Sequence, residues 1–151
     1  MENKDEIKME YKKLGNSGLK VSRFTLGNWT NAQDEGEENQ ANFNEMVKVA
    51  YKHGVNFFDT AECYGDNGAG ERILGKALKT LDTSRHNYCV ATKIFWGKFE
   101  TEDNTIINSF GTSRKHLIEG VERSLKNLEL EYIDVLFCHR YDAETPTLET
   151  C

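Results

Sequence analysis

Four side chains in this sequence could share the work of moving a proton: Asp59, Tyr64, Lys93 and His139. A phenol is a weak acid at neutral pH, but a nearby ammonium stabilises its phenolate form, and a carboxylate can hold that ammonium in place. Tyr64 could therefore donate a proton to a carbonyl oxygen while a hydride arrives at the carbonyl carbon. His139 could hydrogen-bond the same oxygen and orient it. Together these residue types suit the reduction of a carbonyl group.

Each of the four also has a purely structural interpretation. Asp59 could be a helix cap or a turn residue, and Tyr64 could be a loop aromatic. Lys93 could be a solvated strand end, and His139 a hydrogen-bonded imidazole at a strand end. For any one of them alone, the structural interpretation is the better one. Their shared position at the ends of three successive predicted strands favours a common site, because such strand ends converge on one pocket.

The strands that would carry these residues are four short β-rich runs, at residues 21–27, 55–60, 88–93 and 133–139. The fourth run is nearly continuously apolar. Runs of this kind suit strands that are buried on both faces, as in a parallel sheet covered by helices. The same reasoning predicts that Cys89 and Cys138, which lie inside two of these runs, are small buried hydrophobes.

Helical patterns separate the strands, because apolar residues recur there at intervals of three and four. We expect the first helix to end at His53-Gly54 and the third to begin after Ser113, a candidate N-cap. The apolar faces are Phe43, Met46, Val47, Ala50 and Tyr51 in the first helix, Ile73, Leu74, Ala77, Leu78 and Leu81 in the second, and Leu117, Val121, Leu125 and Leu128 in the third. This alternation predicts parallel strands joined by crossover helices.

The spacing of the strands favours a (β/α)₈ barrel. The runs begin at residues 21, 55, 88 and 133, so they are 34, 33 and 45 residues apart, and such a barrel spends about 31 residues on each unit. The long third interval predicts an extra loop at 95–111, on the side where barrels place their active sites. Before the first unit, Gly15-Asn16-Ser17-Gly18 predicts a turn between two short strands. We expect this hairpin to cap one end of the barrel.

Three βα units and a fourth strand account for the whole sequence. We therefore expect residues 9–151 to form the N-terminal half of a (β/α)₈ barrel, an incomplete domain preceded by a charged tail at residues 1–8. Thr145-Pro146 predicts a helix start, with Thr as the N-cap and Pro as the first helical residue, five residues before the end of the sequence. This pattern is typical of a fragment, an alternative product or one half of a two-chain assembly. The alternative is a small α/β domain with a flavodoxin-like open sheet, but that fold usually carries a phosphate-binding loop or a final covering helix.

Several motifs resemble the aldo-keto reductases. Phe-Asp-Thr-Ala-Glu-Cys-Tyr-Gly at 58–65 is similar to a signature of that family, and Leu-Gly-Asn-Trp at 26–29 is similar to its motif after the first strand. Four further segments resemble one branch of the family, which contains voltage-gated potassium channel β subunits and their bacterial and plant relatives. These segments are 92–97, 113–116, 130–135 and 139–142. The motifs lie in the expected order from about Tyr11 to the last residue.

The resemblance implies an NADP(H)-dependent oxidoreductase that reduces aldehydes or ketones on a (β/α)₈ barrel. Asp59, Tyr64, Lys93 and His139 match the positions of the family's catalytic tetrad, with the tyrosine as general acid. A second function stays open, that of a potassium channel β-subunit-like regulatory protein. Animal channel β subunits typically carry Asn where this chain has His139, so the histidine favours a reductase. A third possibility is a non-catalytic half-barrel that binds a complementary half or a second copy.

For the cofactor, the resemblance places Asn28, Trp29 and Asp59 near the nicotinamide end, although the family usually has Thr at the position of Asn28. The family's phosphate and adenine contacts come largely from loops after later strands, beyond this sequence. The three glycines of residues 65–70 do not have the spacing of a dinucleotide fingerprint, and they predict a flexible loop before the second helix. The sequence does not distinguish NADPH from NADH as the cofactor, and it does not identify the carbonyl substrate.

Composition excludes several other classes of function. The net charge is -6, and no cluster of Lys and Arg overrules it, which argues against nucleic acid as a partner. No run approaches the roughly 20 apolar residues that span a bilayer, and the charged segment from Met1 to Met9 is not a secretory signal, so we expect a cytoplasmic protein without membrane insertion. The four cysteines form no CxxC pair and no Cys/His cluster has ligand spacing, so we expect no metal site.

Overall fold

The centre of the molecule is a parallel sheet of four strands in the order β3-β4-β5-β6. The structure is a computed structural model that describes residues 8–97 and 107–151. The sheet consists of β3 (Leu26–Gly27), β4 (Phe57–Asp59), β5 (Cys89–Ile94) and β6 (Val135–Cys138), and an antiparallel hairpin of β1 (Tyr11–Lys13) and β2 (Lys20–Ser22) precedes it. The predicted parallel α/β fold with an N-terminal hairpin is confirmed.

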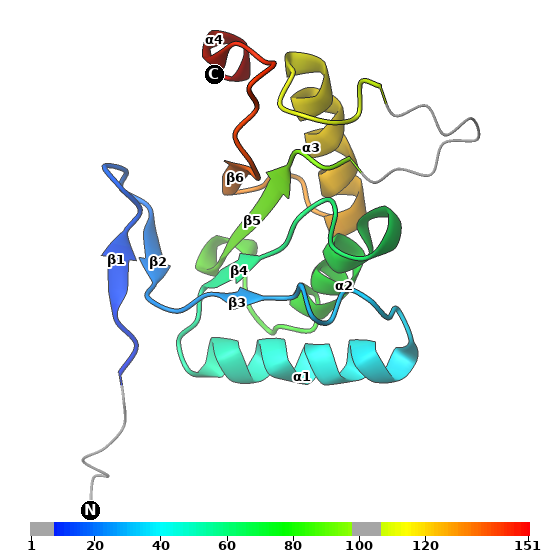
Figure 1. The fold of residues 1–151 in the computed structure, drawn as a ribbon. Coiled ribbons are helices and arrows are strands. Elements are labelled where there is room, and N and C mark those ends of the chain that lie inside the picture. The colour runs from blue at the N-terminus through cyan, green and yellow to red at the C-terminus, as the bar shows by residue number, and fades with distance from the viewer. Residues whose placement is uncertain (1–7, 98–106) are drawn as a thin grey trace, which may run out of the picture.

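Helices connect the parallel strands. They are α1 (Glu37–Lys52), α2 (Ala69–Leu78) and α3 (Arg114–Leu128), with a short α4 (Thr147–Thr150) near the end of the chain and two 3₁₀ turns, η1 (Asp66–Gly68) and η2 (Arg85–Asn87). Figure 1 shows the hairpin on the opposite side of the sheet from α2 and α3. The predicted helix signals are confirmed at two ends: Gly54 has a left-handed φ of +90° after α1, and the Ser113 side chain accepts a hydrogen bond from His116 N at the start of α3.

The main core lies between the sheet and the helices. Each fully buried large apolar side chain stabilises the fold by about 1.5–3 kcal/mol. The buried members of this core are Phe43, Val47, Val55, Phe58, Ile73, Leu74, Ala77, Leu78, Tyr88, Val90 and Leu128. Successive residues of a strand point to opposite faces, so Phe57 and Ala91 pack on the other face, with Val21 of the hairpin. Asp59 and Lys93, each two residues further along, therefore lie on this second face, away from the helices.

The hairpin covers the end of the sheet opposite the predicted site. Asn56 lies directly before β4, and its Oδ1 accepts a hydrogen bond from Ser22 N at 2.7 Å while its Nδ2 donates to Lys20 O at 3.2 Å. Asp59 lies at the other end of the same strand. The hairpin thus packs against the amino-terminal end of the sheet and leaves the carboxyl-terminal end open for function.

Two strand predictions need correction. The run at 21–27 is not one strand, because the chain bends at Arg23 and Phe24, where Ser22 Oγ donates to Phe24 O at 2.6 Å, and only Leu26–Gly27 joins the parallel sheet. The fourth run was predicted to be buried on both faces, yet Leu136 is 43% and Phe137 41% exposed, and Cys138 is exposed as well. Among the described residues β6 pairs with β5 alone, so its apolar side chains lack a second neighbouring strand. Cys89, in contrast, is buried as predicted.

The helices also differ in detail from their predicted patterns. Of the predicted α3 face, Leu128 is buried, but the other fully buried positions of this helix are His116, Gly120 and Ser124. Pro146 is the N-cap of α4 and not its first helical residue, a shift of one position that is common at helix ends. The predicted tail at 1–8 and extra loop at 95–111 lie largely outside the described residues, since 1–7 and 98–106 are not described.

Candidate active site

Lys93 is the centre of a polar cluster at the carboxyl-terminal ends of β4 and β5. Its Nζ donates to Asp59 Oδ2 at 2.6 Å, to Thr60 O at 2.7 Å and to Tyr64 Oη at 3.3 Å. The Lys93 and Asp59 side chains are only 15% and 24% exposed. A charged pair with little solvent around it interacts more strongly than the same pair in water, and the three acceptors satisfy all three N–H bonds of the ammonium.

The loop after β4 fixes the place of Tyr64. Tyr64 N donates to Ala61 O at 3.1 Å, and Gly70 N donates to Tyr64 O at 2.8 Å. A Cβ at Gly70 would lie 2.8 Å from Tyr64 Cβ, and one at Gly65 would lie 1.9 Å from Ala32 O. The segment at 65–70, predicted to be a flexible glycine loop, therefore uses its glycines for close packing behind the tyrosine.

His139 completes the cluster from the end of β6. Its backbone N donates to Ile94 O at 3.1 Å, which continues the pairing of β6 with β5. Its ring centroid lies 5.9 Å from that of Tyr64, with the planes at 73°. Burial lowers the pKa of His139 below its ordinary value of 6.5, and the positive charges of Lys93 and Arg140 lower it further, against smaller opposing effects of Asp59 and Glu62. The imidazole is therefore neutral at pH 7 and can donate one hydrogen bond and accept another.

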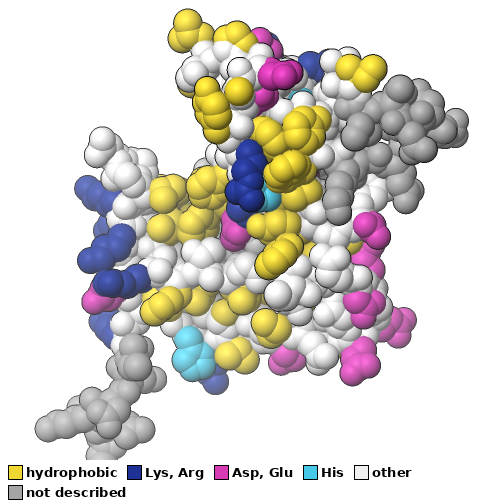
Figure 2. Space-filling view, in the orientation of Figure 1, with side chains coloured by type: hydrophobic (Ala, Val, Ile, Leu, Met, Phe, Trp, Pro, Cys, Tyr) yellow, Lys and Arg dark blue, Asp and Glu magenta, His cyan; other side chains and the backbone are white. Residues whose placement is uncertain are grey.

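Two neighbouring cavities open on this cluster. One of about 550 Å³ is lined by Thr25, Phe57, Asp59, Lys93, Phe137, Cys138, His139 and Arg140. The other, of about 430 Å³, is lined by Trp29, Cys63, Tyr64, Trp96, His139 and Arg140. His139 and Arg140 line both cavities. Figure 2 shows hydrophobic side chains on either side of a group of basic and histidine side chains near the ends of β5 and β6. Apolar walls with a few convergent polar groups are typical of small-molecule sites.

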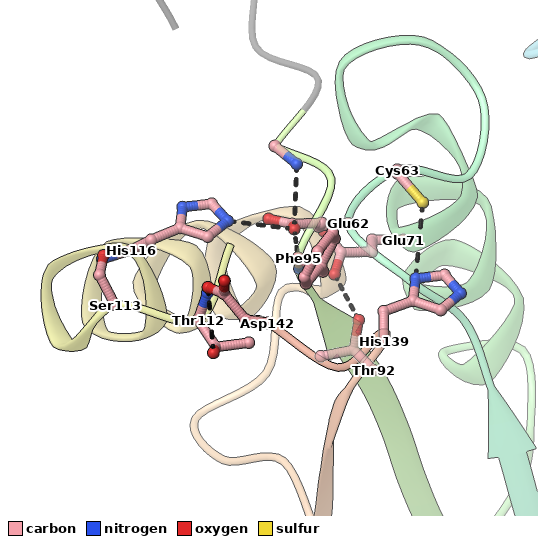
Figure 3. Close-up of polar contacts among 11 residues, drawn as sticks. Glu62, Cys63, Glu71, Thr92, Phe95, Thr112, Ser113, His116, His139 and Asp142 are labelled. Carbon is pink, nitrogen blue, oxygen red and sulfur yellow. Dashed lines mark hydrogen bonds and ion pairs between the residues drawn. The ribbon is translucent and has the colours of Figure 1, made fainter. Parts of the chain in front are cut away.

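A second polar network lies sealed beneath the open cluster. Glu62 is 2% exposed, and its Oε1 accepts hydrogen bonds from Phe95 N at 2.6 Å, Gly97 N at 3.2 Å and His116 Nε2 at 3.3 Å. Figure 3 shows this carboxylate between the start of α3 and the loop after β5. Because Glu62 lies two residues before Tyr64, it ties the loop that carries the tyrosine to the segment that carries Trp96.

Glu71 of α2 belongs to the same buried layer. Its Oε1 accepts from Thr92 Oγ1 at 2.7 Å and its Oε2 from Asn127 Nδ2 at 2.9 Å. Burial raises the pKa of Glu71, while the hydrogen bonds from Asn127 and Thr92 oppose the rise. The carboxyl group anchors α2 and α3 to the back of β5, directly behind Lys93.

The structure brings all four predicted catalytic residues together and separates the predicted cofactor residues. Trp29 lines the smaller cavity and is 66% exposed. Asn28 lines neither cavity and is fully buried, with its Nδ2 donating to Gly70 O at 2.5 Å. Asn28 therefore supports the loop that positions Tyr64, and its Oδ1 has no hydrogen-bond partner among the described residues.

Sequence reasoning missed four residues of the site: Glu62, Cys63, Trp96 and Arg140. Glu62 and Cys63 stand inside the 58–65 motif, and an acidic residue two positions before the tyrosine was a signal that could have been used. Trp96 lies three residues after the predicted strand end at Lys93, and Arg140 directly follows the one at His139. Both stand inside the segments at 92–97 and 139–142 that resemble the channel β-subunit branch, which was a signal that could have been used.

Comparison with known proteins identifies the fold that this site belongs to. The sequence matches the Aldo/keto reductase family over residues 23–151. The chain belongs to the aldo/keto reductase family. The domain of this family is a (β/α)₈ barrel, so the four parallel strands and their helices are part of such a barrel, as predicted.

Curated relatives point to one branch of the family. A probable voltage-gated potassium channel subunit beta of Arabidopsis thaliana is 44% identical over 142 residues, and a protein of the same name in Oryza sativa subsp. japonica is 42% identical; each match covers 94% of this chain and 40% of the relative. A putative voltage-gated potassium channel subunit beta of Schizosaccharomyces pombe is 45% identical over 136 residues, 90% of this chain and 38% of the relative. The chain thus spans about 40% of the length of the curated relatives it matches.

The described residues fit the nicotinamide end of the cofactor that the family generally uses. The cavity walls offer an aromatic face in Trp29 and hydrogen-bonding groups in Asp59, Tyr64 and His139. No group of three His, Cys, Asp or Glu side chains in the described ranges is placed to hold a metal ion. Within the same ranges, none of the helices has the length and apolar character needed to cross a membrane.

Proposed function

We propose that this protein is an NADP(H)-dependent oxidoreductase that reduces aldehydes or ketones, with Tyr64 as the general acid. The observation that carries the proposal is the position of Lys93 Nζ, which lies 2.6 Å from Asp59 Oδ2 and 3.3 Å from Tyr64 Oη. An ammonium at that distance stabilises the phenolate that remains after proton donation. Asp59 holds the ammonium in place, so the proton of Tyr64 is the one that leaves.

The proton would be donated within the smaller cavity, which Tyr64 and His139 both line. A carbonyl oxygen placed there accepts the proton of Tyr64 Oη and a hydrogen bond from the neutral His139 ring, whose lowered pKa keeps it uncharged. A bound nicotinamide would supply the hydride to the carbonyl carbon. Trp29 and Asp59 are the residues of this chain that we expect to hold it, and Asn28 acts on the site through Gly70.

Cofactor binding is the first test. Both tryptophans of the chain, Trp29 and Trp96, line the smaller cavity, so their fluorescence reports on its occupancy. We expect saturable quenching on titration with NADPH. If a folded chain shows no quenching with NADPH or NADH, the proposed cofactor is wrong.

The role of Tyr64 is tested by Tyr64→Phe, assayed by NADPH oxidation with a panel of aldehydes and ketones. Losing a general acid typically costs 10²–10⁴-fold in rate, and we expect a loss in that range with unchanged quenching. The matched control is Tyr141→Phe, because Tyr141 is 86% exposed. Equal turnover in the two variants would contradict the proposed acid.

A second candidate function is regulation of a potassium channel, and the names of the relatives favour it. Under that function, cofactor binding would control association with a membrane partner and not turnover. Co-purification of a channel from membranes, unaffected by Tyr64→Phe and accompanied by no carbonyl reduction, would favour this second candidate over the first.

A further inference from the structure

The imidazole of His139 can serve a substrate in only one of its two neutral forms. A neutral ring carries its proton on one nitrogen and accepts on the other, and the hydrogen bond made by one nitrogen sets the state of the other. His139 lines both cavities, so the nitrogen that faces them must carry the proton in order to donate to a ligand oxygen. Something else must then act on the other nitrogen.

The group next to that other nitrogen is a thiol. Cys63 Sγ lies 3.7 Å from His139 Nδ1, and Figure 3 shows the two side chains facing each other with Nε2 on the far side of the ring. Cys63 is half-buried and lines the smaller cavity together with His139 and Tyr64. Its position is fixed by the same 61–64 turn that positions the tyrosine, in which Tyr64 N donates to Ala61 O.

The charges around the pair decide the direction of this hydrogen bond. Lys93 of β5 and Arg140 after β6 disfavour an imidazolium, and Asp59 of β4 and Glu62 of the following loop oppose them with a smaller effect; burial acts in the same direction as the two cations and lowers the pKa of His139. The ring of Tyr64 also lies beside the imidazole, with the two ring centroids 5.9 Å apart. Since the ring is neutral, its unprotonated nitrogen is a good acceptor, whereas sulfur is a weak one. The bond therefore runs from S–H to nitrogen.

We propose that Cys63 is a positioning residue: its thiol donates to His139 Nδ1 and thereby fixes the tautomer that presents Nε2–H to the cavities. The catalytic consequence rests on the proposed function, because only a carbonyl reductase needs this donor at the oxygen. The tautomer itself does not depend on that function, so it is measured without cofactor or substrate.

The experiment is long-range ¹H–¹⁵N NMR of the histidine rings in ¹⁵N-labelled protein at pH 8, with His139 assigned from His139→Asn. We expect His139 Nε2 to carry the proton and Nδ1 to be an unprotonated acceptor. A protonated Nδ1 at pH 8, whether in the neutral ring or in an imidazolium paired with a thiolate, overturns the proposal. This measurement uses the unmodified protein and does not depend on the folding of any Cys63 variant.

Titration of Cys63 variants gives a second test, because the direction in which the pKa of His139 changes depends on which partner donates the hydrogen bond. Removing a hydrogen bond that favours the neutral ring raises the pKa of an imidazole, whereas removing a thiolate partner lowers it. We expect Cys63→Ala to raise the pKa of His139 and broaden its tautomer distribution, and Cys63→Ser to restore both because a hydroxyl also donates. Cys138→Ala is the matched control, since Cys138 lines the larger cavity beside His139 and should leave the ring unchanged. A lower or unchanged pKa in Cys63→Ala would overturn the proposal even if reductase activity is found.

Different results would contradict the role of Cys63 and the proposed reductase function. If the tautomer is as expected but NADPH does not bind, Cys63 positions His139 and the proposed function is wrong. If reduction is found, Cys63→Ala should lower kcat by about three- to tenfold with little change in KM, as expected for the loss of one weak oriented hydrogen bond, and Cys63→Ser should recover most of it. Turnover that is unchanged in Cys63→Ala would show that the tautomer has no part in catalysis.

Discussion

The open cluster of Asp59, Tyr64, Lys93 and His139 and the sealed network of Glu62, Glu71, His116 and Thr92 are built from similar residue types in neighbouring layers. In the open cluster, the ammonium of Lys93 is shared between a carboxylate and a phenol beside two cavities. In the sealed network, the carboxyl groups accept hydrogen bonds from backbone N–H groups and from Thr92, Asn127 and His116, and they are fully buried. The two regions therefore differ in their access to a ligand and not in the presence of ionisable groups.

The two regions are mechanically connected. Glu62 lies in the short segment between Asp59 and Tyr64 and binds the backbone of Phe95 and Gly97 after β5. Buried hydrogen-bonded groups of this kind hold a site within the narrow geometry that catalysis needs. We therefore expect mutations in the open cluster to change activity with little effect on stability, and mutations in the sealed network to do the reverse.

The largest effect is expected for Lys93→Met. In the proposed mechanism the substitution removes the cation that stabilises the phenolate of Tyr64, so we expect carbonyl reduction to fall by about 10²–10⁴-fold, with the helical signal in circular dichroism unchanged. Lys48→Met is the matched control, because Lys48 pairs with Glu45 on the exposed surface and exposed pairs contribute little. A loss of activity that only tracks a loss of folded protein would show that Lys93 supports the fold.

The next effect is expected for Glu62→Ala, which leaves the buried donors Phe95 N and Gly97 N without their acceptor. Unsatisfied buried donors cost about 1–3 kcal/mol each, so we expect the free energy of unfolding in urea to fall by roughly 2–5 kcal/mol. Glu62→Gln keeps one acceptor oxygen and should lose much less. If Glu62→Ala is as stable as the wild type, the sealed network does not support the site.

Sequence reasoning predicted the open cluster better than the sealed network, for a physical reason. Asp59, Lys93 and His139 end strands whose apolar runs are visible in the sequence, and parallel strands bring such ends together whatever the side chains between them. The buried stripe of α3, in contrast, carries His116, Gly120 and Ser124, which no apolar periodicity detects. Gly120 is small because a Cβ there would lie 2.9 Å from Ile94 Cδ1, a contact between distant segments of the chain.

Exposure was also hard to predict from single runs. The pattern of β6 is as apolar as that of β5, and both suggested full burial. β5 has β4 and β6 as neighbours, whereas β6 has only β5 among the described strands, so Phe137 is exposed and lines the larger cavity. Burial depends on which elements surround a strand, and that information lies elsewhere in the chain.

A smaller effect, with a defined pH dependence, is expected for Glu71→Gln. The pKa of Glu71 is raised in the folded protein above the ordinary value of 4.5, so the folded state loses stability as the pH rises through that raised value and the buried group ionises. Glutamine does not ionise and can accept from Asn127 Nδ2 while donating to Thr92 Oγ1. We therefore expect the variant to gain stability relative to the wild type between pH 4.5 and pH 8 in thermal unfolding. A difference that is constant over this range would show that Glu71 does not titrate there.

The smallest effect on stability at neutral pH is expected for Asp142→Asn. This carboxylate belongs neither to the open cluster nor to the sealed network. Its Oδ2 accepts from Thr112 N and Thr145 Oγ1, both at 2.8 Å, and these bonds lower its pKa from 3.8 to about 2. A lowered pKa means that the carboxylate contributes stability above pH 3.8 and loses it as the pH falls toward 2. An asparagine oxygen can still accept from Thr112 N, so we expect a slight loss of stability at pH 7 that shrinks between pH 4 and pH 2. If the difference in the free energy of unfolding between wild type and variant is the same at pH 7 and pH 2, the lowered pKa of Asp142 does not contribute to stability. A large loss of stability at pH 7 would mean that Asp142 supports the fold as the sealed network does.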